Sequence, residues 1–229
     1  MEDMKTLGEG TIPEPDRATP RKKRSTMGRI LQITGLVFIA AALALGGYIW
    51  WNLWGTGFAT QRAQEDLRPA FERNLASLAP ADAPDRVVKV PGHAVAIIRI
   101  PKIDVDYVVV EGTDTEALKK GPGHYSDTAY PWQDDGRVGI AGHRTTYGAP
   151  FRRLDQLGRG DRIEMLMPYG RFTYTVERTR IVPPTATWVT NRAAHDRLVL
   201  TACHPLYSAA QRIVVFARLS TARARGATA

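Results

Sequence analysis

Residues 30–51 contain no Asp, Glu, Lys or Arg, and no other feature of the sequence constrains the fold as strongly. A helix of this length spans the roughly 30 Å hydrocarbon core of a bilayer. Aromatic residues gather at its far end, as in the aromatic belt of a membrane interface. They are Tyr48, Trp50, Trp51 and Trp54. We therefore predict a transmembrane helix over residues 30–51, which leaves the rest of the chain to form the globular part.

A basic cluster, Arg-Lys-Lys-Arg at residues 21–24, directly precedes this stretch. Positive charge is retained on the cytoplasmic side, so we expect residues 1–29 in the cytoplasm and the chain after about residue 52 outside the cell membrane. Such a cluster can also bind nucleic acid, but its position beside the span favours a topological role, and we expect no nucleic-acid partner. A cleaved signal peptide is the competing interpretation. The stretch is longer than a usual signal core, and no clear A-x-A site follows it.

The composition divides the chain into five segments. Residues 1–29 form a polar, basic tail that we expect to be disordered, followed by the single-pass signal anchor at 30–51. Residues 52–86 combine a stalk helix, indicated by apolar residues at helical spacing over 59–79, with a Pro- and Ala-rich linker. The globular domain spans 87–220, and a short tail covers 221–229.

Charge and composition are compatible with a basic outer domain. Of 229 residues, 44% are hydrophobic, enough for one globular core. The net charge is +8, and residues 1–29 account for only seven basic against five acidic groups. A basic outer domain would suit an anionic surface such as a cell-wall polymer. An arginine-rich genomic composition explains the same charge equally well.

Short β-type runs dominate the globular segment. Residues 93–100 alternate and stop at Pro101, and further runs cover 105–110, 138–141, 198–203 and 212–217. A hairpin is predicted from 162–167 and 171–182. Helical pieces are expected only at 114–121, capped by Asp or Thr, and at 150–157, whereas 123–136 is expected to be a loop. Many short strands with few helices predict a mainly β fold, a closed or nearly closed β-barrel.

The single cysteine, Cys203, ends one of these apolar runs, and Arg212 begins the next. One cysteine excludes an internal disulfide and zinc motifs of the CxxC type. The strand–turn–strand pattern brings a thiol and a guanidinium to one sheet edge. Another buried run ends at His143, and a lone thiol with a histidine elsewhere in the chain is a candidate nucleophile pair.

These three side chains suit acyl transfer through a thioester. A nearby imidazolium or guanidinium favours the reactive thiolate form of a cysteine. His143 can hold the thiolate as an ion pair and then act as general acid. Arg212 stays protonated, so it is unsuited to act as a base. It is better suited to hydrogen-bond the substrate carbonyl or the developing oxyanion. Each residue also has a purely structural interpretation: a small buried hydrophobe, a hydrogen-bonded histidine and a solvated arginine.

The residues next to the nucleophile are candidates for contacting substrate. Thr201 and Ala202 precede Cys203, and backbone N–H groups near His204 are suited to completing an oxyanion hole. Successive side chains of a strand face opposite ways. His204 is therefore poorly placed to pair with Cys203 if the strand continues that far.

The sequence resembles the sortase family, and most closely its class E type from high-GC Gram-positive bacteria. The family's T-L-x-T-C signature stands here as V-L-T-A-C at residues 199–203, followed by Arg212. The segment AGHRTTYGAPF at 141–151 is very like the corresponding class E segment. Further similar segments are RIPKI at 99–103, EGT at 111–113 and GPGHY at 121–125. The resemblance covers roughly residues 90–219.

The resemblance implies an eight-stranded sortase β-barrel and a cysteine transpeptidase. Such an enzyme cleaves a C-terminal sorting signal of secreted proteins, an LPxTG- or LAxTG-like motif, after threonine. It then transfers the protein to an amine of a peptidoglycan precursor or a pilin. His143, Cys203 and Arg212 correspond to the catalytic triad. Val199 and Ala202 stand where threonine is usual, and the hydroxyl missing at Ala202 is one expected to help bind substrate. No acidic cluster matches the calcium site of class A sortases, so we expect no metal and no cofactor.

Two other classes of cysteine enzyme and one non-catalytic role are the alternatives to a sortase function. An L,D-transpeptidase needs an S-H-G-C arrangement, which the sequence lacks. A papain-like hydrolase usually has its cysteine before its histidine, whereas His143 precedes Cys203 here. A non-catalytic, membrane-anchored wall-assembly protein on a sortase scaffold is the remaining alternative, and the presence of all three triad residues argues against it.

Overall fold

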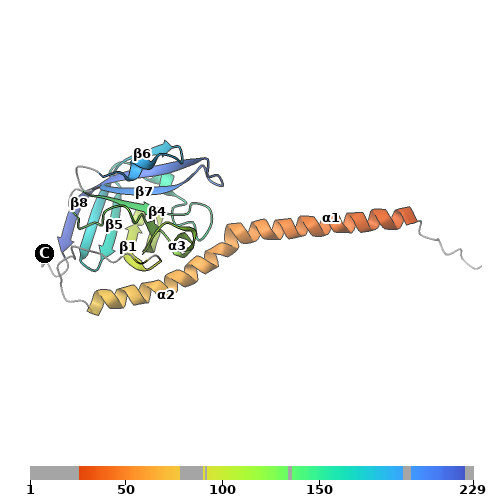
Figure 1. Ribbon diagram of the computed structural model, residues 1–229, viewed down its shortest axis with the longest axis horizontal. Helices are drawn as coiled ribbons and strands as arrows, with labels where there is room; N and C mark the ends of the chain where they lie inside the picture. The colour runs from red at the N-terminus through yellow and green to blue at the C-terminus, as the bar shows by residue number, and fades with distance from the viewer. Residues whose placement is uncertain (1–25, 78–89, 91, 134–135, 193–196, 225–229) are drawn as a thin grey trace, which may run out of the picture. The chain divides into compact units, whose positions relative to one another are not determined.

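The computed structural model describes residues 26–77, 90, 92–133, 136–192 and 197–224 (Figure 1). The chain divides into two compact units, residues 1–45 and residues 46–229. Helix α1 (Thr26–Trp50) has no buried residue and is apolar. Within the described residues there is one helical stretch, Thr26–Leu75, that is long and apolar enough to cross a membrane. Residues 26–29 of the predicted disordered tail are helical and form the start of α1. The rest of that tail, residues 1–25, and the 79–84 linker lie outside the described residues.

The second unit is built on a closed barrel of eight strands, which confirms the predicted mainly β, eight-stranded fold. Neighbouring strands follow the order β1-β2-β3-β4-β7-β8-β6-β5. Their bounds are β1 Ala94–Ile100, β2 Val105–Glu111, β3 Gly123–His124, β4 Arg137–Ala141, β5 Arg162–Met167, β6 Gly170–Val182, β7 Arg197–His204 and β8 Gln211–Ala224. The pairs β2–β3 and β4–β7 are parallel, and the other pairs are antiparallel.

Both faces of β1 and β2 are apolar because each face meets a different partner. Ile98 and Val109 point into the barrel core. Ile97 and Val108 point outward, where Phe71 of helix α2 (Thr56–Ser77) covers them. Phe71 is only 3% exposed, and burying a side chain of this size contributes about 1.5–3 kcal/mol. The helix expected over 59–79 therefore packs on the barrel wall, beside β1 and β2.

The remaining local predictions are met in part. Helix α3 (Thr115–Lys120) begins at Asp114, whose carboxylate accepts the N–H groups of Glu116 and Ala117, as an N-cap does. The helix expected at 150–157 is shorter, with only a 3₁₀ turn at Leu154–Gln156. The loop expected at 123–136 contains strand β3. Two residues are too few to show a strand periodicity, which explains why the pattern misses this strand.

Candidate active site

The ends of β4 and β7 lie side by side, and each leads to a candidate catalytic residue. The parallel pairing runs up to Ala141 opposite Thr201, and the N–H of Gly142 then donates to the carbonyl of Thr201 at 3.0 Å. His143 follows β4 by two residues, and Cys203 lies two residues beyond Thr201 on β7. In a parallel pair, the carboxyl ends of both strands lie at the same edge of the sheet. His143 and Cys203 therefore lie at the same end of the barrel.

Cys203 pairs directly with Arg212 across the antiparallel β7–β8 ladder. The thiol is half-buried and not in a disulfide. Nη1 of Arg212 donates to the carbonyls of Ala209 and Gln211, each at 2.9 Å. These two bonds hold the guanidinium against the loop that joins the strands. The structure therefore brings the thiol and the guanidinium to one sheet edge.

His143 lies in a partly apolar setting beside Tyr147. The two ring centroids are 4.9 Å apart with the rings tilted by 36°. Its Nε2 atom is buried and has no hydrogen-bond partner among the described residues. Burial lowers the pKa of His143 below the usual value for histidine, since loss of solvent disfavours the charged form. Burial therefore favours the neutral form of this imidazole.

The three residues expected to contact substrate are placed differently from one another. Thr201, only 4% exposed, is bonded through Oγ1 to the hydroxyl of Tyr125 at 2.9 Å. It shares a strand face with Cys203, two residues on. Ala202 belongs to the barrel core and is also 4% exposed, so its side chain faces away from Cys203. β7 continues through His204, which places that imidazole on the face opposite the thiol.

Arg144 ties the end of β7 to the loop that carries His143. Its side chain is 2% exposed and forms an ion pair with Asp155 at 3.0 Å. Nη1 donates to Nδ1 of His204 at 2.9 Å and approaches the carbonyl of Cys203 at 3.5 Å. Since a guanidinium only donates, Nδ1 of His204 is the acceptor, and the ring proton lies on Nε2. Arg144 therefore contacts the backbone of Cys203 and the side chain of His204 at the end of β7.

Arg144, Tyr147 and Tyr125 are not among the candidate functional residues that the sequence indicates. Arg144 and Tyr147 lie within the distinctive segment 141–151, immediately beyond a strand-end histidine. An arginine directly after a candidate catalytic histidine is a signal that could have been followed. Tyr125 has no such signal, because its contact with Thr201 depends on a pairing 76 residues away in sequence.

A buried polar cluster lies beneath β2 and β3. Oε2 of Glu111 accepts from the Tyr130 hydroxyl at 2.8 Å and lies 3.0 Å from Nδ1 of His124. Nε2 of His124 faces the carbonyl of Ala129 at 3.1 Å, so that nitrogen carries a proton. Burial pushes the pKa of Glu111 upward, but hydrogen bonds from His124, Ser126 and Tyr130 and the electrostatic attraction of His124 together outweigh this, and the net pKa is lowered. The cluster is a buried ion pair that joins two strands.

No group of three or more His, Cys, Asp or Glu side chains suited to holding a metal ion occurs in the part of the chain that the structure describes. The half-buried Cys203 thiol, the His143 imidazole and the Arg212 guanidinium belong to neighbouring strands and the residues that follow them. They can support nucleophilic attack, proton transfer and oxyanion stabilisation.

Comparison with known proteins agrees with this arrangement. The Sortase domain family matches residues 98–220. The chain is 32% identical to Sortase D of Bacillus subtilis over 200 residues, which cover 83% of this chain and 99% of that protein. The solved structure of sortase E from Streptomyces avermitilis has a TM-score of 0.54 and 33% identity, covering 59% of this chain and 93% of that one. Sortase E1 from Streptomyces coelicolor, solved with a tripeptide in its active site, has a TM-score of 0.56 and 29% identity over 60% of this chain and 94% of that one.

These relatives include proteins named sortase D and proteins named sortase E. The family match covers more than half of the chain, and the barrel topology fits it. The chain therefore belongs to the sortase family of cysteine transpeptidases.

Proposed function

We propose that this sortase cleaves an LPxTG- or LAxTG-like sorting signal after its threonine and transfers the upstream protein to a cell-wall amine, with Cys203, His143 and Arg212 as the catalytic residues. The observation that carries the proposal is the direct pairing of Cys203 with Arg212, next to the end of the strand that leads to His143. The acceptor is an amine of a peptidoglycan precursor or of a pilin.

In the first half-reaction the Cys203 thiolate attacks the threonine carbonyl of the signal. The carbonyl oxygen becomes an oxyanion, which the guanidinium of Arg212 stabilises by hydrogen bonding. The C–N bond then breaks. The imidazolium of His143 donates its proton to the departing amine, and a thioester to Cys203 remains.

In the second half-reaction an amine attacks the thioester carbonyl. Neutral His143 accepts the proton that the amine loses, and the C–S bond breaks to release the Cys203 thiolate and a new amide. Because burial lowers the pKa of His143, a larger fraction of the imidazole is neutral and available to accept this proton. Thr201, on the thiol's face of β7, is the adjacent residue best suited to contact the signal.

The test is peptide cleavage and amine transfer by the full-length chain in detergent micelles. Fluorogenic peptides with LPxTG- and LAxTG-like motifs are compared, with and without added glycine peptides as acceptors. We expect cleavage and transfer by the wild type and neither by Cys203→Ala. A correctly folded Cys203→Ala chain that still transferred the peptide would remove the thiol from the mechanism.

We also propose that residues 1–29 are cytoplasmic, that 30–51 anchor the chain, that 52–86 connect the anchor to the catalytic domain at 87–220, and that this domain is outside the cell. Support comes from the basic cluster at 21–24 and the apolar helix α1. Protease added to intact protoplasts should digest the chain beyond about residue 52 and spare the N-terminus. Protection of the barrel would contradict this topology.

A further inference from the structure

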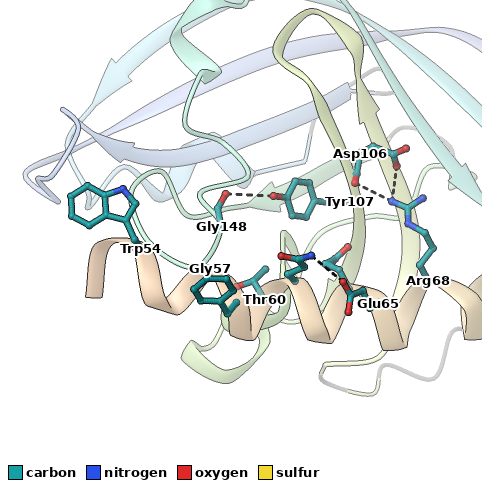
Figure 2. Close-up of a pocket in the computed structure, with 11 residues that line it drawn as sticks. Trp54, Gly57, Thr60, Glu65, Arg68, Asp106, Tyr107 and Gly148 are labelled. Carbon is teal, nitrogen blue, oxygen red and sulfur yellow. Dashed lines mark hydrogen bonds and ion pairs between the residues drawn. The ribbon is translucent and has the colours of Figure 1, made fainter. Parts of the chain in front are cut away.

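Helix α2 is bonded to the barrel through every fourth residue of one face. Thr60 donates to the carbonyl of Lys119 at 2.7 Å. Gln64 pairs with both the N–H and the carbonyl of Val108, at 2.7 and 3.0 Å. Arg68 bonds the carbonyl and carboxylate of Asp106 (Figure 2). Side chains of α2 can reach these backbone groups in only one alignment of the helix along the barrel wall, so the helix is held in a defined position.

Thr56, one turn before Thr60 on the same face, reaches the loop that carries His143. Its hydroxyl donates to the carbonyl of Asn52 at 3.0 Å. The same oxygen accepts the backbone N–H of Tyr147 at 3.0 Å. The hydroxyl thus uses both its donor and one acceptor position, and it joins the start of α2 to a residue 91 positions away.

The loop at this point has an unfavourable backbone conformation. Tyr147, Gly148 and Ala149 have positive φ angles of 52°, 71° and 43°. Only glycine adopts this region freely, so two of the three residues are strained and need surrounding contacts to hold them. Gly148 is packed between α2 and β2, in the wall of a pocket of about 540 Å³ (Figure 2).

The contacts of Gly148 come from three neighbours. A Cβ atom placed on Gly148 would lie 3.4 Å from the Tyr107 hydroxyl and 3.6 Å from Cγ2 of Thr60. A Cβ atom on Gly57 would lie 3.6 Å from the nitrogen of Gly148. The Tyr107 hydroxyl also donates to the Gly148 carbonyl at 3.4 Å (Figure 2). Residues at the start of α2 and on β2 therefore hold the strained loop from two sides.

We propose that α2 is a working part of the active site and that Thr56 is a positioning residue, which holds Tyr147 against the ring of His143. The link is short: Thr56 binds the Tyr147 backbone, and the Tyr147 ring lies 4.9 Å from His143. A π-helical turn, Trp51–Gly55, leads directly into α2. The segment that leads from the anchor thus directly supports the catalytic loop. The inference rests on the proposed role of His143.

The test compares Thr56→Val, which keeps the side chain's shape, Thr56→Ala, which favours the helix, and Thr56→Ser, which keeps the hydroxyl. The full-length chain is used in micelles. Losing one such bond typically changes an equilibrium about 3- to 10-fold. We expect Val and Ala to lower kcat by this factor with little change in KM, and to speed hydrogen exchange at the Tyr147 amide. Ser should stay within about 2-fold of the wild type.

Thr175→Val is the matched control, because Thr175 bonds only Ser220 on the barrel surface in the described structure; it should leave kcat and Tyr147 exchange unchanged. Wild-type kcat and exchange in Thr56→Val would overturn the proposal, as would equal damage by Ser and Val. If Thr56→Val and Thr56→Ala both unfolded while Thr56→Ser remained folded, the bond would serve overall stability, and this result would also overturn the proposal. If no peptide were cleaved by the wild type, the proposed function would fail, while amide exchange at Tyr147 and the alkylation rate of Cys203 would still decide the role of Thr56.

Discussion

Replacing Arg144 with methionine tests how the nucleophile's strand end is held. Methionine fills much of the arginine's volume but cannot donate a hydrogen bond. The change removes the bond to Nδ1 of His204 at 2.9 Å and the longer contact with the Cys203 carbonyl at 3.5 Å. It also removes the ion pair with Asp155. His204 then loses the donor that orients its ring.

The expected size of the effect follows from these contacts. A hydrogen bond from a charged donor contributes about 1.5–3 kcal/mol. The Asp155 carboxylate is half exposed, so its ion pair adds less than about 1 kcal/mol. If the free energy of the charged hydrogen bond serves to position Cys203, its loss should lower kcat/KM about 10- to 150-fold, since 1.36 kcal/mol corresponds to a factor of ten. Arg144→Lys should lie between, because one ammonium cannot serve all the partners of a guanidinium.

The assay is peptide cleavage by full-length variants, with Tm measured on the same samples. Asp155→Asn is the control: it removes the ion pair and leaves the bond to His204, so kcat/KM should change by less than about 5-fold. A lower Tm with wild-type kcat/KM in Arg144→Met would refute the reasoning, since Arg144 would then stabilise the fold without positioning the nucleophile.

Three further predictions follow from the same structure. Arg212→Lys should lower kcat about 10²–10³-fold in the cleavage assay, because lysine keeps the charge but loses the planar donor pair; near-normal turnover would exclude Arg212 from the site. Glu111→Ala should destabilise the fold by about 3–5 kcal/mol in urea unfolding, since it leaves a buried partner unpaired, while the exposed Glu116→Ala should leave stability nearly unchanged. Because the pKa of Glu111 is lowered, its contribution is present above its ordinary pKa of 4.5 and should shrink as pH falls below that value; a pH-independent difference would contradict the ion pair. Tyr147→Ala should expose His143, raise its pKa toward about 6.5 and move the alkaline limb of kcat/KM to higher pH, because the protonated imidazole is the acid of the first half-reaction; an unmoved limb would show that Tyr147 does not bury the imidazole.

The strands that could be predicted are those whose side chains alternate or form apolar runs. Residues 105–110 and 162–167 are expected as strands from their pattern and lie in β2 and β5. The N-cap at Asp114 could also be predicted from sequence, because a cap depends only on neighbours two and three residues away. β3 is not, since two residues show no period.

The candidate site divides in the same way. Cys203 and Arg212 could be placed on one sheet edge because a hairpin fixes their pairing locally. The bonding partners of Arg144 and Thr56 could not be predicted from sequence, because they depend on how distant segments pack. Ala202 was expected beside the substrate from its position next to the cysteine. Strand alternation turns its side chain into the barrel core.

The central claim is that Cys203 forms a thioester with the sorting peptide. Because the chain has one cysteine, intact-mass spectrometry after rapid acid quenching can detect the acyl group without ambiguity. We expect an adduct equal to the peptide up to its threonine, located on Cys203, present in the wild type and lost on adding an acceptor amine or hydroxylamine. Peptide cleavage by the wild type with no adduct on Cys203 at any quench time, or an adduct on another residue, would contradict it.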